Sequence, residues 1–258
     1  MSRKRRRIPA LELVRLEQGY HVLAPGGAFV VLSPCEREEF FPDMLKKVFG
    51  RVHAPLEAAG QLLWCTRQSE RPRRRHEITF HVRGANGQPL GFVSRPGVFS
   101  YGRFDDGARA LTEVMAVAPG DAVLDLGCGC GAVGVIAGLR AGPDGRTTFT
   151  DSNVRAVTLA EMNARAAGLA RFDAVATHLP EQLDVRFDLV AANLPYYAQQ
   201  SIAHHFIEAA RTLLKPGGRF YLVTRQPKQV EENIVAAFAE AEVILRRGYS
   251  VFCARRER

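Results

Sequence analysis

The fold is decided by one stretch of sequence, Val123-Leu124-Asp125-Leu126-Gly127-Cys128-Gly129-Cys130-Gly131, where an apolar strand-like run meets alternating glycines. Residues 132–139 are small and apolar and predict a helix directly after the glycines. Glycines at such a turn let the backbone approach a ligand closely and leave the helix N-terminus open as a polar platform. Because the same region also fits the dinucleotide pattern G-x-G-x-x-G, the glycines predict a nucleotide-type site without deciding its ligand.

Two carboxylates beside this loop narrow the choice of ligand. Asp125 lies two residues before Gly127, where a negative charge repels a pyrophosphate and suits the ammonium group of S-adenosylmethionine. Asp151 follows the next predicted strand, 147–150, at a position where a carboxylate can accept both ribose hydroxyls of a nucleoside. The pair therefore favours S-adenosylmethionine, and NAD, which carries a pyrophosphate, is a distant alternative.

Strands and helices alternate from the loop to the end of the chain. The predicted strands span 122–126, 147–150, 188–192, 220–223 and 249–254, and the predicted helices span 132–139, 154–167, 202–214 and 230–240. Before them, residues 76–82 and 90–93 lie on either side of a Gly-Ala-Asn-Gly turn and predict a hairpin. This order predicts an α/β domain over 76–258 with a doubly wound, mostly parallel seven-stranded sheet of the Rossmann-like type.

A second candidate site follows the predicted strand 188–192, at the sheet edge where the glycine loop also lies. Its sequence is Asn193-Leu194-Pro195-Tyr196-Tyr197. An amino group on a flat ring needs hydrogen-bond acceptors, and the Asn193 side-chain oxygen and the Leu194 carbonyl can supply two. Pro195 stiffens the turn, and the Tyr196 ring offers a stacking surface for a base. The segment therefore predicts a pocket for the exocyclic amine of a base.

Basic residues concentrate in the first third of the chain. The net charge is +8, and residues 1–75 hold 15 of the 35 Lys and Arg residues but 8 of the 27 Asp and Glu residues. Two clusters carry this excess, residues 3–7 and the run Arg71-Pro72-Arg73-Arg74-Arg75. Guanidinium groups match phosphate geometry, so the arginines of the second cluster are expected to contact RNA.

An internal repeat accounts for part of that first third. Residues 23–32, Leu-Ala-Pro-Gly-Gly-Ala-Phe-Val-Val-Leu, closely echo residues 214–223, Leu-Lys-Pro-Gly-Gly-Arg-Phe-Tyr-Leu-Val, and the echo ends at Arg67 and Arg255. Residues 20–67 are therefore interpreted as a truncated copy of the last third that lacks the glycine loop. The expected domains are a basic N-terminal tail at 1–19, the repeat at 20–67, an Arg-rich linker at 68–75 and a catalytic domain at 76–258.

Composition excludes several other classes of protein. The 258 residues are 47% hydrophobic and 24% charged, which rules out a disordered, collagen-like or coiled-coil chain. No apolar run approaches the roughly 18–20 residues that span a bilayer. The five cysteines lack the paired spacing of zinc ligands, so reduced thiols and no metal are expected. These features predict a cytoplasmic protein without a membrane partner, and a monomer is favoured.

Taken together, these motifs resemble a class I S-adenosylmethionine-dependent methyltransferase. Motif I corresponds to 125–131, and motif IV corresponds to 193–196, with Asn-Leu-Pro-Tyr in place of the amino-methylating N-P-P-[YF]. Residues 95–100, Arg-Pro-Gly-Val-Phe-Ser, and 106–111, Asp-Gly-Ala-Arg-Ala-Leu, are similar to the segment that leads into the catalytic domain of the small methyltransferase (MTS) family. That family includes ribosomal RNA guanine-N2 methyltransferases, with a C type for the small ribosomal particle and a G type for the large one. It carries an N-terminal duplicate without cofactor.

The resemblance implies a function and a set of site residues. It implies methyl transfer from S-adenosylmethionine to an exocyclic amino group in ribosomal RNA, with guanine N2 favoured and ribosomal RNA or ribosomal subunits as partner. The implied cofactor-binding residues are Asp125, Gly127, Gly129, Gly131, Asp151, His178 and Asn193. The implied catalytic residues are Asn193, Leu194, Pro195 and Tyr196, and the implied substrate-binding residues are Tyr196, Tyr197, Phe99, Arg71, Arg73, Arg74 and Arg75.

Three alternative functions stay open. Leu194 gives a form of motif IV that is similar to ribosomal RNA adenine-N6 dimethyltransferases, so adenine N6 in RNA or DNA is an alternative target. Methylation of a protein glutamine at N5 uses a related motif IV, although the arginine clusters would then have no evident role. A non-enzymatic RNA-binding protein with an inactive pocket is the third alternative, and the intact glycines, both carboxylates and Asn193 argue against it.

Overall fold

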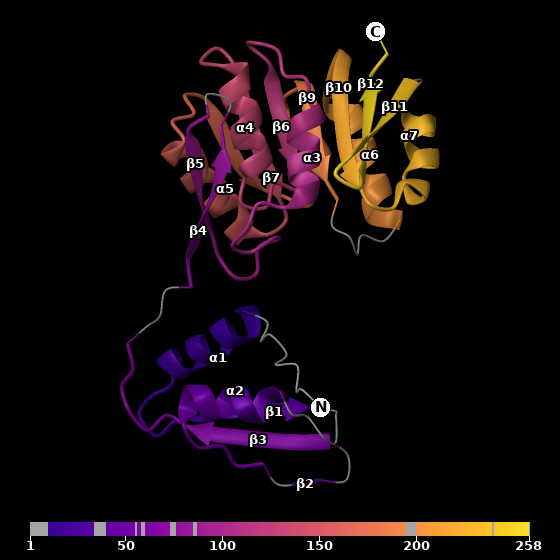
Figure 1. The fold of residues 1–258 in the computed structure, drawn as a ribbon. Helices are drawn as coiled ribbons and strands as arrows, with labels where there is room; N and C mark the ends of the chain where they lie inside the picture. Colours follow the sequence, from indigo (N-terminus) through magenta and orange to yellow (C-terminus); the bar gives the residue numbers. More distant parts are fainter. Residues whose placement is uncertain are drawn as a thin grey trace. The chain divides into compact units, whose positions relative to one another are not determined.

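The chain folds into two units, Met1–His76 and Glu77–Arg258, shown as ribbons in Figure 1. The computed structural model describes residues 10–33, 40–54, 56–57, 60–72, 76–84, 87–194, 200–238 and 240–257. The second unit contains two hydrophobic cores and the first unit contains one. Each unit is therefore described by itself.

The second unit is built on a seven-stranded sheet with the strand order β11-β12-β10-β9-β6-β7-β8 (Figure 1). The strands are β6 (Ala122–Leu126), β7 (Arg146–Asp151), β8 (Phe172–Ala176), β9 (Phe187–Asn193), β10 (Leu214–Thr224), β11 (Glu240–Arg246) and β12 (Tyr249–Arg255). β12 pairs antiparallel with β10 and β11, and every other neighbouring pair in this sheet is parallel. The predicted doubly wound, mostly parallel seven-stranded sheet is confirmed.

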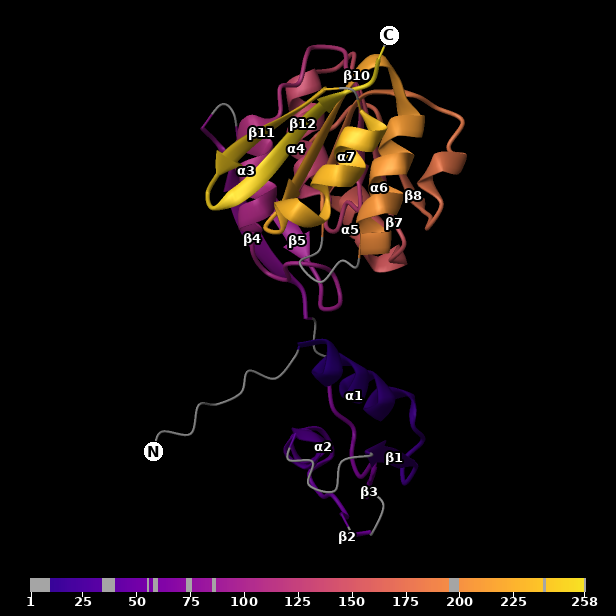
Figure 2. The ribbon, with the colours of Figure 1, turned by 90° about the vertical axis from the view of Figure 1, so that its right-hand side faces the viewer.

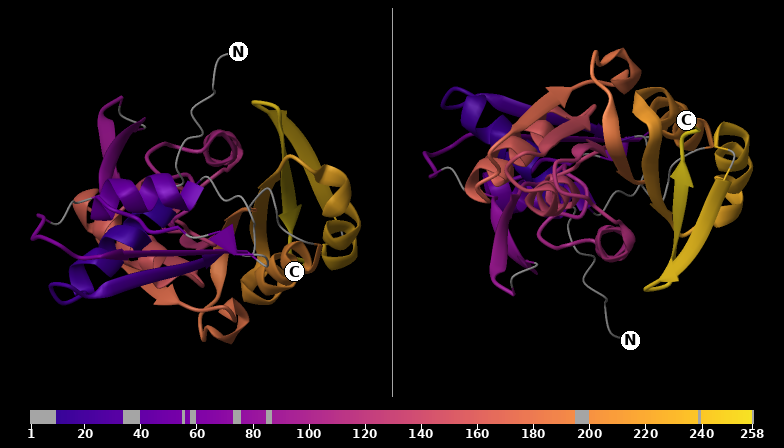
Figure 3. Two further views of the ribbon diagram at one scale, coloured as in Figure 1. Left: turned by 90° about the horizontal axis from the view of Figure 1, so that it is seen from below. Right: turned by 90° about the horizontal axis from the view of Figure 1, so that it is seen from above.

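Helices cover both faces of this sheet and form a core on each (Figure 2, Figure 3). α3 (Asp106–Val114), α4 (Ala132–Ala141) and α5 (Val154–Ala166) contribute to one core, and α6 (Gln200–Leu213) and α7 (Glu231–Ala237) contribute to the other. Successive residues of a strand point to opposite faces, so Val123 joins the α3–α5 core and Leu124 joins the α6–α7 core. Two covered faces explain why the central strands read as continuous apolar runs.

Two glycines let α4 lie close to the sheet. A Cβ atom at Gly138 would lie 2.3 Å from Thr147 Oγ1, and one at Gly134 would lie 2.4 Å from Phe149 Cε1. Neither position has room for a side chain, so this helix can approach β7 only with glycine at both places. The close approach brings the first turn of α4 against the end of β6, where the Gly134 N–H contacts Asp125.

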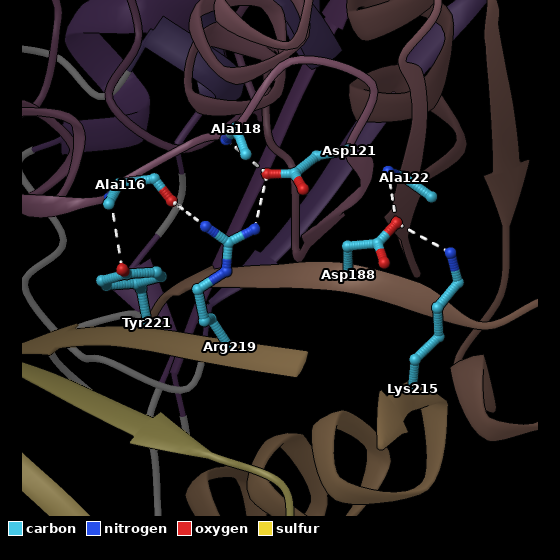
Figure 4. Close-up of polar contacts among 8 residues, drawn as sticks. All are labelled: Ala116, Ala118, Asp121, Ala122, Asp188, Lys215, Arg219 and Tyr221. Atoms are coloured by element: carbon cyan, nitrogen blue, oxygen red, sulfur yellow. Dashed lines mark hydrogen bonds and ion pairs between the residues drawn. The ribbon is translucent and has the colours of Figure 1, made fainter. Parts of the chain in front are cut away.

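Polar contacts fasten the connection before β6 to β10 (Figure 4). Arg219 donates to Asp121 Oδ2 at 2.6 Å and to the Ala116 carbonyl at 2.8 Å. The Ala118 N–H donates to the same Asp121 oxygen at 2.7 Å, and the Ala116 N–H donates to the Tyr221 hydroxyl at 3.2 Å. These bonds fix the amino end of β6, and the glycine loop begins at the other end of that strand.

The predicted hairpin before the sheet is confirmed and consists of β4 (Ile78–Arg83) and β5 (Pro89–Ser94). It contacts α5, where the buried Asn163 fixes its position. The Asn163 side chain accepts from the Val93 N–H at 2.8 Å and donates to the carbonyls of Val93 at 2.9 Å and Cys130 at 2.8 Å. One buried amide therefore ties the hairpin to the glycine loop.

The first unit places two helices on one face of a three-stranded antiparallel sheet. Its elements are α1 (Ala10–Val22), β1 (Ala28–Ser33), α2 (Phe40–Phe49), β2 (Leu56–Glu57) and β3 (Gly60–Thr66), with the strand order β1-β3-β2. Residues 10–19, predicted as part of a basic tail, form most of α1. They do so because Val14, Leu16 and Tyr20 are buried, and Leu16 and Tyr20 belong to the core shared with α2 and β3.

The first unit has the same order of elements as the end of the second. α1-β1-α2-β2-β3 corresponds to α6-β10-α7-β11-β12, and the strand order β1-β3-β2 corresponds to β10-β12-β11. The strand pairs are antiparallel in both sets. This agreement supports the interpretation of the first unit as a truncated copy, which stays a prediction.

A shared arginine contact adjusts the alignment of the two copies by one residue. Arg67 forms two backbone hydrogen bonds with the Pro-Gly-Gly turn at 25–27, and its guanidinium donates to the carbonyl two residues before the proline. Arg256 makes the same three bonds with the turn at 216–218. The structural equivalent of Arg67 is therefore Arg256 and not Arg255, with which the sequence echo aligns it.

Two strands differ from the ranges read from the sequence. The predicted helix 230–240 is too long, since α7 ends at Ala237 and β11 begins at Glu240. β11 is an edge strand in which Val243 and Leu245 are exposed, so its pairing with β12 rather than burial defines it. No strand was predicted over β8, the opposite edge of the sheet, whose residues are only partly buried.

Candidate functional site

A cavity of about 350 Å³ lies at the carboxyl edge of the parallel strands in the second unit. Its wall includes the loop after β6, the end of β7, Asn193 of β9, two residues of α6 and the segment that leads into α3. The chain leaves β6 for α4 on one face of the sheet and leaves the adjacent β9 for α6 on the other face. The cavity is therefore at a topological switch point, where doubly wound sheets bind their ligands.

The glycine loop has a backbone that side chains rarely adopt. Gly127, Gly129 and Gly131 have φ values of 72°, 55° and 81°, all in the left-handed region. The Gly127 and Cys128 N–H groups donate to the Thr150 carbonyl at 2.8 and 2.9 Å, which anchors the loop to β7. The loop thus turns tightly from β6 into α4 and leaves its backbone along the cavity wall.

Asp125 is buried beneath this loop, with 3% of its surface exposed. Its Oδ2 accepts from the Gly134 N–H at 2.7 Å, in the first turn of α4. Burial raises the pKa of Asp125 to about 8, the Gly134 hydrogen bond opposes that rise, and the nearby charge of Asp151 adds to it. An ionised carboxyl here carries a free-energy cost that a positively charged ligand in the cavity would reduce.

Asp151 ends β7 and joins the glycine loop to α5. Its Oδ2 accepts from the Gly129 N–H at 3.0 Å, and its Oδ1 accepts from the Asn153 N–H at 2.8 Å. Asn153 is the N-cap of α5, and its side-chain oxygen accepts from the Arg155 N–H at 3.1 Å. The carboxylate is held in one orientation at the cavity wall, and each oxygen keeps a second lone pair for a hydroxyl donor.

Asn193 ends β9 and faces the same side of the sheet as Asp125. Ala191 is paired with Asp125, and Asn193 lies two residues further along the strand, so its side chain is on the α3–α5 face. Asn193 Nδ2 donates to Asp105 Oδ2 at 3.0 Å. Asp105 is the N-cap of α3, so the amide is attached to the start of that helix.

The cavity brings together most of the predicted site residues that the structure describes. Its wall includes Asp125, Gly127, Gly129, Asp151, Asn193 and Phe99. Gly131 has a packing role instead, because a Cβ atom there would lie 2.8 Å from the Ala160 backbone. Leu194 is 4% exposed and its side chain belongs to the α6–α7 core, which leaves its carbonyl as the predicted acceptor.

His178 is not in the cavity wall as the structure describes it. Its side chain is exposed, and its carbonyl accepts a hydrogen bond from His205 Nε2 at 3.0 Å. The implied contact between His178 and the adenine of a cofactor gains no support and stays a prediction. Pro195, Tyr196, Tyr197, Arg73, Arg74 and Arg75 lie outside the described residues.

Arg71 lies in the first unit and is held against an aromatic ring. Its guanidinium is 5.6 Å from the centroid of the Tyr20 ring and donates to the Lys47 carbonyl at 3.1 Å. The guanidinium of Arg67 is also 5.6 Å from that centroid. Two positive charges are therefore fixed around one buried tyrosine, which is consistent with the predicted phosphate contact but does not test it.

Sequence reasoning missed several residues of the cavity wall. These are Phe80, Arg103, Phe104, Asp105, Ile202 and Phe206. For Asp105 a signal existed, because an aspartate directly before an amphipathic segment is a typical helix N-cap. The ring of Phe206 lies against Gly127, where a Cβ atom would be 2.9 Å from it, and no local sequence pattern predicts that contact between α6 and the loop.

The cysteines of the glycine loop are buried thiols. Burial raises the pKa of Cys130 to about 11 and that of Cys128 well above its ordinary value. Within the described ranges, no three His, Cys, Asp or Glu side chains come together in a way that could hold a metal ion. None of the helices in the described part of the chain is long and apolar enough to cross a bilayer.

The fold and the cavity define an α/β protein with a nucleotide-type site at the switch point of a doubly wound sheet. The chain belongs to the methyltransferase small domain family, whose model matches residues 89–253. This match confirms the predicted resemblance to the small methyltransferase family.

Known proteins similar to this chain include two ribosomal RNA methyltransferases. The chain is 33% identical over 163 residues to the ribosomal RNA small subunit methyltransferase C of Chromohalobacter salexigens, which covers 60% of this chain and 48% of the relative. It is 28% identical over 259 residues to the ribosomal RNA large subunit methyltransferase G of Streptomyces avermitilis, covering 92% and 66%. The chain therefore spans about half to two thirds of the length of these curated relatives.

A solved structure shares the fold. It is a 16S rRNA N2 methyltransferase of T. thermophilus, determined in complex with AdoMet and guanosine. The TM-score is 0.77 at 23% identity, and the match covers 97% of this chain and 71% of that one. The likeness confirms the predicted Rossmann-like fold class.

Proposed function

We propose that this protein transfers a methyl group from S-adenosylmethionine to an exocyclic amino group of a base in ribosomal RNA, with guanine N2 as the favoured target. The observation that carries the proposal is the shared cavity, in whose wall Asp125, Asp151 and Asn193 lie together. Family membership and the names of the two curated relatives support the reaction and the substrate class. The proposal assigns to this cavity the two ligand types bound in the T. thermophilus structure.

The charge of the cavity fits S-adenosylmethionine better than a dinucleotide. Among its described wall residues, Asp105, Asp125 and Asp151 are acidic and Arg103 is basic. A ligand with an ammonium and a sulfonium group reduces the cost of ionising the buried Asp125, whereas a pyrophosphate would add negative charge to the same site. The donor set of the cavity therefore matches a cationic nucleoside.

Each wall residue has a defined part in holding that ligand. Asp151 presents the free lone pairs of an immobilised carboxylate to the ribose hydroxyls, and the Gly129 backbone is held beside it. Asp125 keeps the loop folded onto α4 through Gly134 and supplies negative charge under the cavity. S-Adenosylmethionine, when bound, supplies a methyl group that is already activated by its positive sulfur. The chain then needs to orient the two reacting groups, a contribution of order 10⁵ M or more in effective molarity.

The acceptor amine is assigned to Asn193 and the turn that follows it. The side-chain oxygen of Asn193 and the carbonyl of Leu194 accept from the amine and stabilise the positive charge that develops on its nitrogen. No residue of the chain has to form a covalent bond in this scheme. Stacking of the base by Tyr196 and Tyr197 stays a prediction for residues outside the described ranges.

The RNA partner is assigned from charge. The excess of basic residues lies in residues 1–75, and Arg71 and Arg67 hold two of those charges around Tyr20. On this proposal the first unit contributes phosphate contacts while the second contains the reaction site. The proposed setting is the cytoplasm, where ribosomal RNA and ribosomal particles are available.

The test is transfer of a trideuterated methyl group from labelled S-adenosylmethionine. The full chain is incubated separately with small ribosomal subunits, large ribosomal subunits, protein-free ribosomal RNA, DNA and a release factor, and the digested products are weighed. The proposal expects label on N2 of guanosine from ribosomal RNA, and none when Asn193→Ala replaces the wild type. Label on adenine N6 or on glutamine would favour the corresponding alternative, and no label together with no cofactor binding would contradict the enzymatic function.

A further inference from the structure

We propose that Asp105 is a positioning residue that turns the side-chain oxygen of Asn193 toward the acceptor amine. The inference rests on the proposed function and adds a residue that the sequence motifs do not assign to the reaction. It concerns two side chains that are 88 residues apart in the chain and meet at the cavity wall.

Two hydrogen bonds converge on one oxygen of Asp105. Its Oδ2 accepts from the Ala108 N–H at 3.0 Å, which caps the start of α3, and also accepts from Asn193 Nδ2 at 3.0 Å. The backbone of Asp105 is extended, with φ −66° and ψ 140°, as an N-cap requires. Asp105 is 5% exposed, so both bonds are shielded from water. The carboxylate is therefore fixed by the helix before it acts on the amide.

A carboxylate determines which way the amide points. An ionised carboxylate only accepts hydrogen bonds, so Asn193 must present its NH₂ group to Asp105. The two polar atoms of an amide lie on opposite sides of one carbon, and Oδ1 is consequently turned away from Asp105. Without that constraint the side chain could rotate and offer its NH₂ group, a donor, to an amine that itself donates.

Close packing keeps the pair in place. A Cβ atom at Gly107 would lie 2.9 Å from Asp105 Oδ2, 3.0 Å from Asn193 Oδ1 and 3.0 Å from Tyr249 Cε1. The first turn of α3 therefore lies directly against both polar side chains, and only glycine leaves them room. Tyr249 is 2% exposed and closes the other side.

The charge of Asp105 also strengthens the acceptor. A negative group beside the NH₂ end of an amide draws its dipole further toward Oδ1, and such polarisation is effective at a buried position. Two consequences follow and can be separated experimentally. Asp105 fixes the orientation of the amide, and its charge increases the ability of Oδ1 to stabilise a developing positive nitrogen.

Two substitutions separate these effects from the capping of α3. Asp105→Ser retains a good N-cap for the Ala108 N–H, but its shorter side chain does not reach Asn193. Asp105→Asn can place an oxygen where both N–H donors converge, so it retains the geometry and removes the charge. Asp106→Ser is the matched control, because Asp106 is the adjacent, exposed acidic residue in the first turn of the same helix.

The first readout needs neither cofactor nor RNA. The full chain is labelled with ¹⁵N-asparagine, and the side-chain amide signal of Asn193 is assigned by its loss in Asn193→Ala. We expect Asp105→Ser to shift this signal and to equalise its two proton environments, Asp105→Asn to shift it less, and Asp106→Ser to leave it unchanged. An unchanged signal in Asp105→Ser would overturn the proposal.

The second readout is the division between turnover and binding. We expect Asp105→Ser to lower kcat about 100-fold and Asp105→Asn about tenfold, with S-adenosylmethionine affinity unchanged in both. In an Asn193→Ala background the same substitutions should cause no further loss, since their target is absent. An equal loss of kcat in that background, or a loss shared with Asp106→Ser, would show a merely structural role. If the wild type transfers no methyl group, the proposed function fails, and the amide signal still decides whether Asp105 orients Asn193.

Discussion

The buried carboxyl of Asp125 makes the stability of the second unit depend on pH. Its pKa is raised from 3.8 to about 8 by burial. A carboxyl whose pKa is higher in the folded state stabilises the fold fully below the unfolded pKa, and that stabilisation is lost as the pH rises toward the folded pKa. The gap corresponds to about 6 kcal/mol across the whole interval, at about 1.4 kcal/mol for each pH unit.

The perturbation is Asp125→Asn, which stays neutral at every pH and can still accept from the Gly134 N–H. Relative to the wild type, the free energy of unfolding of this variant should rise by about 3 kcal/mol between pH 5 and pH 7. At pH 4 the two proteins should be nearly equal in stability. All other titrating groups are common to both, so their contributions cancel in the difference.

The assay is urea unfolding of the ligand-free protein at one-unit pH steps from 5 to 8. The single tryptophan, Trp64, lies in the first unit, so circular dichroism and amide exchange of β6 are better probes than tryptophan fluorescence. Asp188→Asn is the control. Burial raises the pKa of Asp188, but the hydrogen bond and charge of Lys215 outweigh that effect and lower it, so the Asp188→Asn difference should be flat over this range. A pH-independent difference for Asp125→Asn would refute the reasoning.

Two further predictions concern the support of the site. Gly134→Ala places a Cβ atom 2.9 Å from Asp125 Oδ2, so it should weaken S-adenosylmethionine binding more than tenfold and destabilise the fold by about 2 kcal/mol, as calorimetry and urea unfolding would show; wild-type binding by this variant would contradict the tight contact between α4 and β6. Arg219→Ala leaves the buried Asp121 without its ion-pair partner and should cost about 3 kcal/mol. Lys215→Ala, which breaks a more exposed pair, should cost at most about 1 kcal/mol, and equal losses would show that burial is not the cause.

The parts of the fold that could be predicted are those with local patterns. The apolar strands on either side of the glycine loop, the hairpin and most helices follow from periodicity within short windows. Asp125 and Asp151 were placed because a strand end and a glycine loop fix where a carboxylate can lie. The structure brings both to one cavity wall, as the motif predicts.

The parts that could not be predicted depend on contacts between distant residues. The bond between Asp105 and Asn193 joins the start of α3 to the end of β9, and neither segment indicates the other. β11 reads as a continuation of α7 because its residues are partly polar, and only pairing with β12 makes them a strand. The alignment of Arg67 with Arg256 likewise follows from hydrogen bonds rather than from residue identity.

The most direct test is calorimetric titration of the full chain, and of two variants, with S-adenosylmethionine. The wild type should bind, and Asp151→Ala should lose about 100-fold in affinity, because a charged acceptor of two hydrogen bonds is removed. Asn193→Ala should bind like the wild type, since the account assigns this residue to the acceptor amine. Full affinity in Asp151→Ala, or an equal loss in Asn193→Ala, would contradict the division of the cavity between donor and acceptor.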